Sequence, residues 1–155
     1  MTQRKGVNIS MNVIISACLL GANCRYDGKC VRKVDVQRLE AKYRLIPVCP
    51  EIYGGLPTPR EQGERNGDRV ITKSGADVTE QYLRGAQETL NMARMFDCHM
   101  AILKERSPSC GSVLIYDGTF SGTLKMAEGV TAELLLQNGI RVYGESQIPQ
   151  LLEQK

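Results

Sequence analysis

Short apolar runs alternate with amphipathic stretches along this chain, and the alternation predicts strands and helices in turn. Apolar runs typical of strands lie at residues 12–17, 44–48, 99–104 and 140–143, and the run 99–104 is typical of a buried strand. Apolar residues recur at helical spacing over residues 34–43, 77–97, 130–138 and 148–153. Helices placed between apolar strands favour an α/β fold, here a single-domain layer sandwich with a mostly parallel, Rossmann-like sheet and right-handed crossovers.

Individual residues refine some of these boundaries. Pro47 lacks the N–H that a central strand uses, so we expect an edge or terminal position there. Asp77 and Glu80 have the spacing of a capping box, which predicts that the long helix begins there. Gly139 follows residues 130–138 and is typical of a helix end.

Two stretches interrupt the alternation. Residues 54–76 are rich in Gly, Pro and charge, and only residues 69–72 among them are strand-like. We interpret this stretch as an excursion that carries a hairpin. Residues 113–117 and 119–125 flank Asp117-Gly118, a dipeptide typical of tight turns, so they predict a second hairpin.

The size and charge of the chain limit the classes of protein to consider. A length of 155 residues with 42% hydrophobic content suits one compact domain, which we assign to residues 12–155, with residues 1–11 as an N-terminal extension. The net charge of +3 comes from scattered basic residues, and aromatic residues are few. Proteins that bind long nucleic acids have clustered basic and aromatic residues. We therefore expect a small-molecule partner.

The N-terminus superficially resembles a secretion signal, because basic residues precede the apolar stretch 13–22. No small-residue cleavage site follows, and charged residues come directly after, so we expect no export. No other run approaches the ~20 apolar residues that span a membrane. We expect a cytoplasmic location, where cysteines more often bind metal or do chemistry than form disulfides.

Three of the six cysteines share a context, because Cys18, Cys49 and Cys110 each follow a predicted strand. If these strands are parallel neighbours, the three thiols emerge at one edge of the sheet, where open α/β folds build their sites. Three thiolates at one place suggest a metal or cluster site with a coordination position left open. The alternative is that all three are small buried hydrophobic residues near strand ends.

The choice of metal is narrowed by what the chain lacks. Its single histidine, His99, lies away from the cysteine loops, and zinc sites usually show closely paired cysteines. The wider spacing of Cys18, Cys24 and Cys30 fits neither that pattern nor a thioredoxin-type dithiol. Isolated cysteines on separate loops are compatible with an iron–sulfur cluster in which three irons carry thiolates and a fourth is open.

The residues around the three cysteines form motifs. They read Ser-Ala-Cys-Leu-Leu-Gly-Ala-Asn-Cys-Arg-Tyr-Asp-Gly around Cys18, Val-Cys-Pro-Glu-Ile-Tyr-Gly-Gly-Leu-Pro-Thr-Pro-Arg around Cys49, and Leu-Lys-Glu-Arg-Ser-Pro-Ser-Cys-Gly around Cys110. In this order and spacing, the motifs resemble those of the small bacterial family, long catalogued as a domain of unknown function, that includes the thiouracil desulfurases. The resemblance covers residues 12–144.

This resemblance implies a [4Fe-4S] cluster on Cys18, Cys49 and Cys110, whose open iron takes the sulfur of a thiolated pyrimidine base such as 2-thiouracil. It also implies that Glu51 and Ser107 handle protons and water in a hydrolysis without net electron transfer. Without the family, Glu51 is typical of a solvated loop carboxylate and Ser107 of a turn hydroxyl.

Further motif residues are candidates for holding the substrate or the cluster. They are Asn23, Arg25, Tyr26, Asp27, Gly54, Gly55, Arg60, Ser109 and Gly111. Solvation or turn formation explains the polar ones equally well. The glycine pair 54–55 is typical of a close backbone approach or a turn, and Ser109 and Gly111 are candidate hydrogen-bond donors to cluster sulfides.

Three classes of function stay open from the sequence. The first is the hydrolytic desulfurase, the second is a zinc or thiol enzyme that uses the same cysteines, and the third is a cluster-bearing sensor or carrier without turnover. Cys24 lies close to Cys18 along the chain, but a fourth thiolate would saturate the cluster, so we predict that Cys24 does not ligate. Cys30 and Cys98 receive no predicted role.

Overall fold

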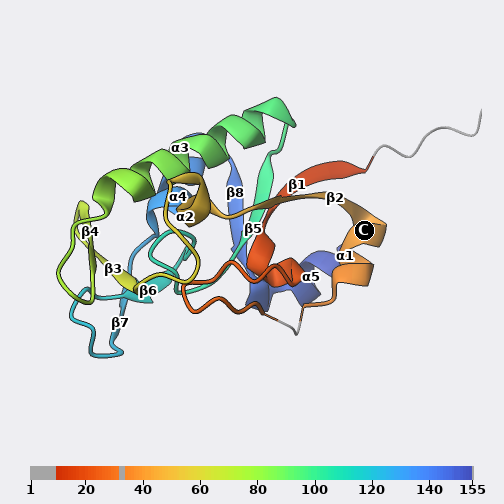
Figure 1. Ribbon diagram of the computed structural model, residues 1–155. Coiled ribbons are helices and arrows are strands. Elements are labelled where there is room, and N and C mark those ends of the chain that lie inside the picture. The colour runs from red at the N-terminus through yellow and green to blue at the C-terminus, as the bar shows by residue number, and fades with distance from the viewer. Residues whose placement is uncertain (1–9, 32–33, 155) are drawn as a thin grey trace, which may run out of the picture.

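The computed structural model describes residues 10–31 and 34–154, and its centre is a parallel sheet (Figure 1). The sheet has four strands in the order β2-β1-β5-β8, and neighbouring strands are parallel throughout. Their bounds are β1 (Met11–Ser16), β2 (Tyr43–Val48), β5 (Met100–Leu103) and β8 (Arg141–Gly144). The predicted α/β class with a parallel sheet is confirmed.

Helices cover both faces of this sheet (Figure 1). The helices are α1 (Val36–Lys42), α2 (Pro50–Tyr53), α3 (Thr79–Met95), α4 (Val130–Gln137) and α5 (Ile148–Glu153), with 3-10 turns η1 (Ala17–Leu20) and η2 (Glu145–Gln147). Val13 and Ile15 of β1 pack with residues of α1 and α5, whereas the intervening Ile14 packs with residues of α3 and α4. Because side chains alternate along a strand, β1 is buried on both sides.

The edge position predicted from Pro47 is confirmed, because β2 is the outermost strand beside β1. Pro47 lies opposite Ile15 in that pairing. An edge strand leaves one row of backbone groups outside the sheet, so it tolerates a residue without an N–H. This pairing fixes the position of the segment after β2, which carries Cys49.

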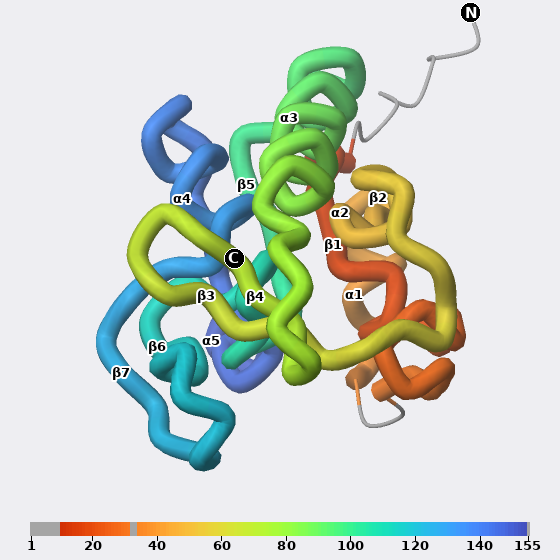
Figure 2. The backbone as a smooth tube through the Cα atoms, turned by 60° about the vertical axis from the view of Figure 1, so that its left-hand side comes forward, coloured from red at the N-terminus to blue at the C-terminus, as the bar shows by residue number. Residues whose placement is uncertain are grey.

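Two antiparallel hairpins lie side by side at one end of the molecule (Figure 2). They pair β3 (Gly63–Asn66) with β4 (Arg69–Thr72), and β6 (Leu114–Tyr116) with β7 (Leu124–Met126). The first hairpin confirms the prediction for the excursion. In the second, a tight turn at Asp117-Gly118 was wrong, because a loop of residues 117–123 joins β6 to β7.

The start of α3 also differs from the prediction. A capping box at Asp77 was wrong, because α3 begins at Thr79 after Val78. The Asp77 carboxylate instead accepts hydrogen bonds from the Thr79 backbone and hydroxyl and pairs with Arg69 of β4 at 2.6 Å. The helix is thus tied to the preceding hairpin.

The N-terminal extension predicted for residues 1–11 lies outside the described residues as far as residue 9. Met11 opens β1, so the sheet begins one residue before the predicted domain boundary. Within the described part of the chain, no helix is long and apolar enough to cross a membrane.

Candidate active site

The structure brings Cys18, Cys49 and Cys110 to the carboxyl end of the sheet. Cys18 lies in η1 directly after β1, Cys49 directly follows β2, and Cys110 lies in the loop that follows β5. These strands are adjacent and parallel, so their carboxyl ends meet at one edge. All three cysteines line one cavity of about 270 Å³. The predicted convergence of the three thiols is thereby confirmed.

Cys24 joins these thiols in the cavity wall. All six cysteines are free. Proximity to the Cys18 thiol raises the pKa of the Cys24 thiol, and the Cys49 thiol lies 3.7 Å from the Cys24 carbonyl oxygen. The contact with Cys24, together with burial, raises the pKa of the Cys49 thiol well above its ordinary value. A cysteine that binds a metal must first lose its thiol proton.

Cys110 is held by a loop that Ser107 organises. The Ser107 hydroxyl oxygen accepts hydrogen bonds from the backbone N–H groups of Ser109 and Cys110, at 3.1 Å each. Burial, reinforced by the Glu51 carboxylate, raises the pKa of Cys110 to about 12. Ser107 therefore does make the turn that its sequence context suggested, and it also lines the cavity.

Ser109 anchors the same loop to α4 and does not reach the cavity. Its buried hydroxyl lies 2.8 Å from the Thr131 hydroxyl, and its carbonyl oxygen accepts from the Thr131 backbone N–H at 2.8 Å. Gly129 allows this close approach, because a Cβ there would lie 2.4 Å from the Ser109 carbonyl carbon. The loop that carries Cys110 is thus held by the hydrogen bonds of Ser109 to Thr131 and by close contact with Gly129.

Glu51 belongs to the one-turn helix α2 and lines the cavity. Its Oε2 atom pairs with the Arg60 guanidinium, and its Oε1 atom accepts a hydrogen bond of 2.7 Å from the Tyr82 hydroxyl. Arg60 also donates to the Cys24 carbonyl oxygen at 2.9 Å. The second and first cysteine motifs are therefore joined through Arg60.

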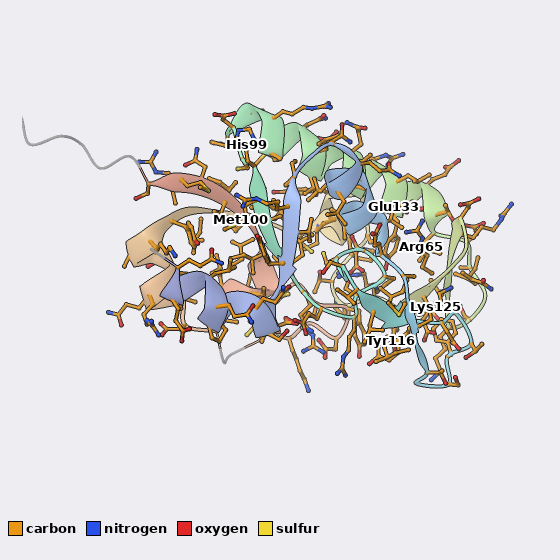
Figure 3. All side chains as sticks on the ribbon, turned by 180° about the vertical axis from the view of Figure 1, so that it is seen from behind. Arg65, His99, Met100, Tyr116, Lys125 and Glu133 are labelled. Carbon is orange, nitrogen blue, oxygen red and sulfur yellow. The ribbon has the colours of Figure 1, made fainter. Side chains whose placement is uncertain are left out.

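The residues that line the cavity include four cysteines, and cysteine thiolates are the ligands that hold iron–sulfur clusters. In the described residues, no three His, Cys, Asp or Glu side chains are grouped to hold one metal ion. A cluster distributes its thiolates over different irons, so its ligands need not converge on one point. His99 takes no part: its exposed ring pairs with Asp97 at the opposite end of the molecule from the cavity residue Tyr116 (Figure 3).

Comparison with known proteins assigns the chain to a family. A model of the family described as 2-thiouracil desulfurase matches residues 13–147. The chain belongs to the 2-thiouracil desulfurase family. It is 41% identical over 150 residues to Uncharacterized protein YbbK of Bacillus subtilis (strain 168), covering 90% of this chain and 99% of that protein. It is also similar to a solved structure, [4Fe-4S]-dependent thiouracil desulfidase TudS (DUF523Vcz), with a TM-score of 0.86, 45% identity, and coverage of 92% of this chain and 95% of that one.

The residues expected to contact the substrate separate into two groups in this desulfurase-family chain. Arg25, Tyr26 and Arg60 line the cavity. Asn23, Gly54 and Gly55 lie outside the lining formed by the described residues, as does Ser109. Gly54 and Gly55 have backbone roles: a Cβ on Gly54 would lie 1.9 Å from the Gln81 carbonyl oxygen of α3, and Gly55 has a φ of +94°. Both positions therefore require glycine.

Arg60 and Asp27 have structural roles as well. The Arg60 guanidinium is buried and donates to Glu51, to the Cys24 and Pro57 carbonyl oxygens and to Thr58. Asp27 accepts from the Lys29 backbone N–H at 3.0 Å, within the loop after Cys24. Arg60 also lines the cavity, and Asp27 pairs with the cavity residue Arg25 at 3.3 Å.

Several residues that line the cavity were not predicted from the sequence. The missed side chains are those of Ser16, Gln62, Tyr82, Lys104, Glu105, Arg106 and Tyr116. Residues 104–106 directly precede Ser107, so their position beside a predicted catalytic residue was the available signal. Tyr82 fitted the apolar periodicity of α3, and that pattern concealed its hydroxyl. Arg106 has a φ of +66°, which is strained for a non-glycine residue and typical of functional sites.

Proposed function

We propose that this protein removes sulfur hydrolytically from a thiolated pyrimidine base such as 2-thiouracil, using a [4Fe-4S] cluster held by Cys18, Cys49 and Cys110. One observation carries the proposal: the thiols of three segments that follow adjacent parallel strands line the same cavity as Glu51 and Ser107. The family and the solved relative support the substrate class and the cofactor.

The cluster would supply an open iron, a soft Lewis acid suited to bind and polarise a thiocarbonyl sulfur. The chain itself supplies the geometry. Its three thiols lie in η1, at the start of α2 and in the loop that Ser107 organises. The sheet and the turns that follow its strands therefore fix the positions of the thiols. Three protein ligands leave one position for the substrate, which a fourth cysteine ligand would close.

Glu51 is the group proposed to receive the proton of the attacking water. Its carboxylate is ion-paired with Arg60, and the ionised form is the one that accepts a proton. Water adds to the carbon that bears sulfur, a carbon–oxygen bond forms, and the carbon–sulfur bond breaks. Sulfide leaves with the electron pair of that bond, so 2-thiouracil and water give uracil and hydrogen sulfide with no net electron transfer.

Ser107 has a hydroxyl proton to donate, since its oxygen already accepts two backbone N–H groups. We assign this O–H to the orientation of the attacking water. The rings of Tyr26 and Tyr116 also line the cavity, and aromatic faces are suited to stack on a planar base. A cavity of about 270 Å³ suits a small molecule in preference to a nucleic-acid strand. The proposed location of the protein is the cytoplasm.

The test is anaerobic reconstitution with iron and sulfide, followed by quantification of iron and of the uracil and sulfide released from 2-thiouracil. Cys110→Ser should lose both cluster and product. Cys30→Ser is the matched control, because Cys30 is half-buried outside the cavity lining among the described residues; it should retain both. Turnover that survives in Cys110→Ser would contradict the ligand assignment.

The same experiment separates the two other functions. If the cluster forms normally but no thiolated base is converted, by the wild type or by Glu51→Gln, the protein is a sensor or carrier. Stoichiometric zinc with turnover in the absence of iron would identify a zinc enzyme that uses the same cysteines. Either result would overturn the proposed function.

A further inference from the structure

Tyr82 combines a core position with a hydroxyl in the candidate active site. It lies on the buried face of α3 with 3% of its surface exposed, and it lines the cavity. Burial, with the adjacent Glu51 carboxylate, raises the pKa of Tyr82 well above its ordinary value. The phenol therefore stays protonated, and its hydrogen bond to Glu51 is one in which the tyrosine donates.

Glycines bring α2 and α3 close enough for this contact. A Cβ on Gly85 of α3 would lie 1.8 Å from the Pro50 carbonyl oxygen, and a Cβ on Gly54 would lie 1.9 Å from the Gln81 carbonyl oxygen. Two reciprocal glycine contacts thus hold the backbones of the helices against each other. Glu51 follows Pro50 directly, so its carboxylate is placed within reach of a side chain of α3.

The two oxygen atoms of Glu51 are held by different partners. Arg60 occupies Oε2, and Tyr82 occupies Oε1 at 2.7 Å. Arg60 compensates the charge of Glu51. Its other N–H groups donate hydrogen bonds to backbone and hydroxyl oxygens of the surrounding loops, which ties these loops together. Rotation of the carboxylate out of this orientation would break the hydrogen bond from Tyr82 to Oε1.

We propose that Tyr82 is a positioning residue for desulfuration, which fixes the Glu51 carboxylate in the orientation that receives the proton of the attacking water. This inference rests on the proposed function, since it assigns Tyr82 an effect on the reaction through Glu51. It requires no contact between Tyr82 and the substrate. This hydrogen bond is already formed before the reaction and holds the reacting group in its productive orientation. Less entropy is therefore lost on reaching the transition state.

The test is Tyr82→Phe in cluster-loaded protein, which removes the hydroxyl and keeps the ring. We expect kcat to fall roughly 10- to 100-fold, as for other residues that orient a reacting group from behind, while KM stays within about twofold because substrate contacts are unchanged. Iron content and the absorption spectrum of the cluster should match the wild type. The control is Tyr53→Phe, since Tyr53 is exposed on α2 and its hydroxyl is 3.5 Å from the Pro47 carbonyl oxygen; it should leave kcat unchanged.

A double-mutant cycle separates positioning from a packing effect. If Tyr82 acts through Glu51, Tyr82→Phe should cause little further loss of kcat in a Glu51→Gln background. An equal loss in both backgrounds, or full activity of Tyr82→Phe beside an impaired Glu51→Gln, would overturn the role of Tyr82 alone. Absence of turnover in the cluster-loaded wild type would overturn the proposed function, and this role with it.

Discussion

Replacement of Gly85 by alanine tests whether backbone contact between α2 and α3 builds the active site. Gly85 lies in the interior of α3 (Thr79–Met95). In an isolated helix the substitution would stabilise by about 1 kcal/mol, because alanine loses less backbone entropy than glycine. Helix propensity and packing therefore predict effects of opposite sign, and the measurement decides between them.

Packing has the stronger effect of the two in this structure. The new Cβ would lie 1.8 Å from the Pro50 carbonyl oxygen and 2.7 Å from its carbonyl carbon, and backbone atoms cannot rotate away as a side chain can. Over-packing of this kind costs about 3 kcal/mol. After subtraction of the gain in propensity, we expect a net loss of about 2 kcal/mol, which for a chain of this size lowers Tm by about 4–8 °C.

The assay is urea unfolding of the reduced protein followed by circular dichroism, together with iron content and kcat after reconstitution. Glu88→Ala is the control, because Glu88 is exposed on the same helix and should change stability by less than about 0.5 kcal/mol. A separation of α2 from α3 also moves Cys49 and Glu51, so Gly85→Ala should lose activity. Gly85→Ala as stable as the wild type, or more stable, would show that close backbone contact does not hold the two helices in place.

Three further substitutions test separate features of the site and the fold. Cys24→Ser should bind about as much iron as the wild type after reconstitution, because three ligands suffice, and loss of iron would show that Cys24 ligates. Arg60→Ala removes the charged partner of the Glu51 carboxylate, in a pair whose side chains are only 6% and 14% exposed. Urea unfolding should therefore show a loss of stability of about 3 kcal/mol, and unchanged stability would contradict this ion pair. Burial and Asp97 raise the pKa of Cys98 to about 11 from 9.0, so the folded state keeps a proton that the unfolded state releases, and stability should fall as pH rises from 9 to 11. Cys98→Ala should reduce that slope, and a slope equal to that of the wild type would argue against the shift.

The strands and the convergence of the cysteines were predictable because both depend on local pattern and on one topological rule. The apolar runs before Cys18 and Cys49 are strands of one parallel sheet, and parallel strands bring the residues after their carboxyl ends to a common edge. The structure bears this out, since both cysteines and Cys110 line one cavity. Distance along the sequence was no obstacle here, because the sheet brings the segments together.

The second hairpin was predicted with the wrong turn because a distant residue determines it. Asp117-Gly118 has the composition of a two-residue turn, yet Oε1 of the buried Glu64 of β3 accepts from the backbone N–H groups of Gly118 and Phe120, at 3.1 Å each. These bonds hold the loop open against the first hairpin. No local pattern around residue 118 reports a carboxylate more than fifty positions away.

The network around Glu51 was only partly predictable. A close backbone approach or a turn was predicted at Gly54, and the close approach is confirmed, but the sequence did not show which backbone comes near. Tyr82 obeys the helical period and therefore counted as core. Only the packing of α2 on α3 shows that the glycine lies against the backbone of α3 and that the tyrosine hydroxyl meets a carboxylate. Such contacts depend on the relative position of two helices, which periodicity does not specify.

Hydrolysis at the cavity can be tested by isotope labelling, in a reaction of the cluster-loaded protein with 2-thiouracil in water enriched in oxygen-18, without oxygen or any added reductant. Hydrolytic desulfuration predicts uracil and sulfide in equal amounts, with labelled oxygen at the carbon that carried sulfur. A requirement for reductant, or uracil without label, would contradict it.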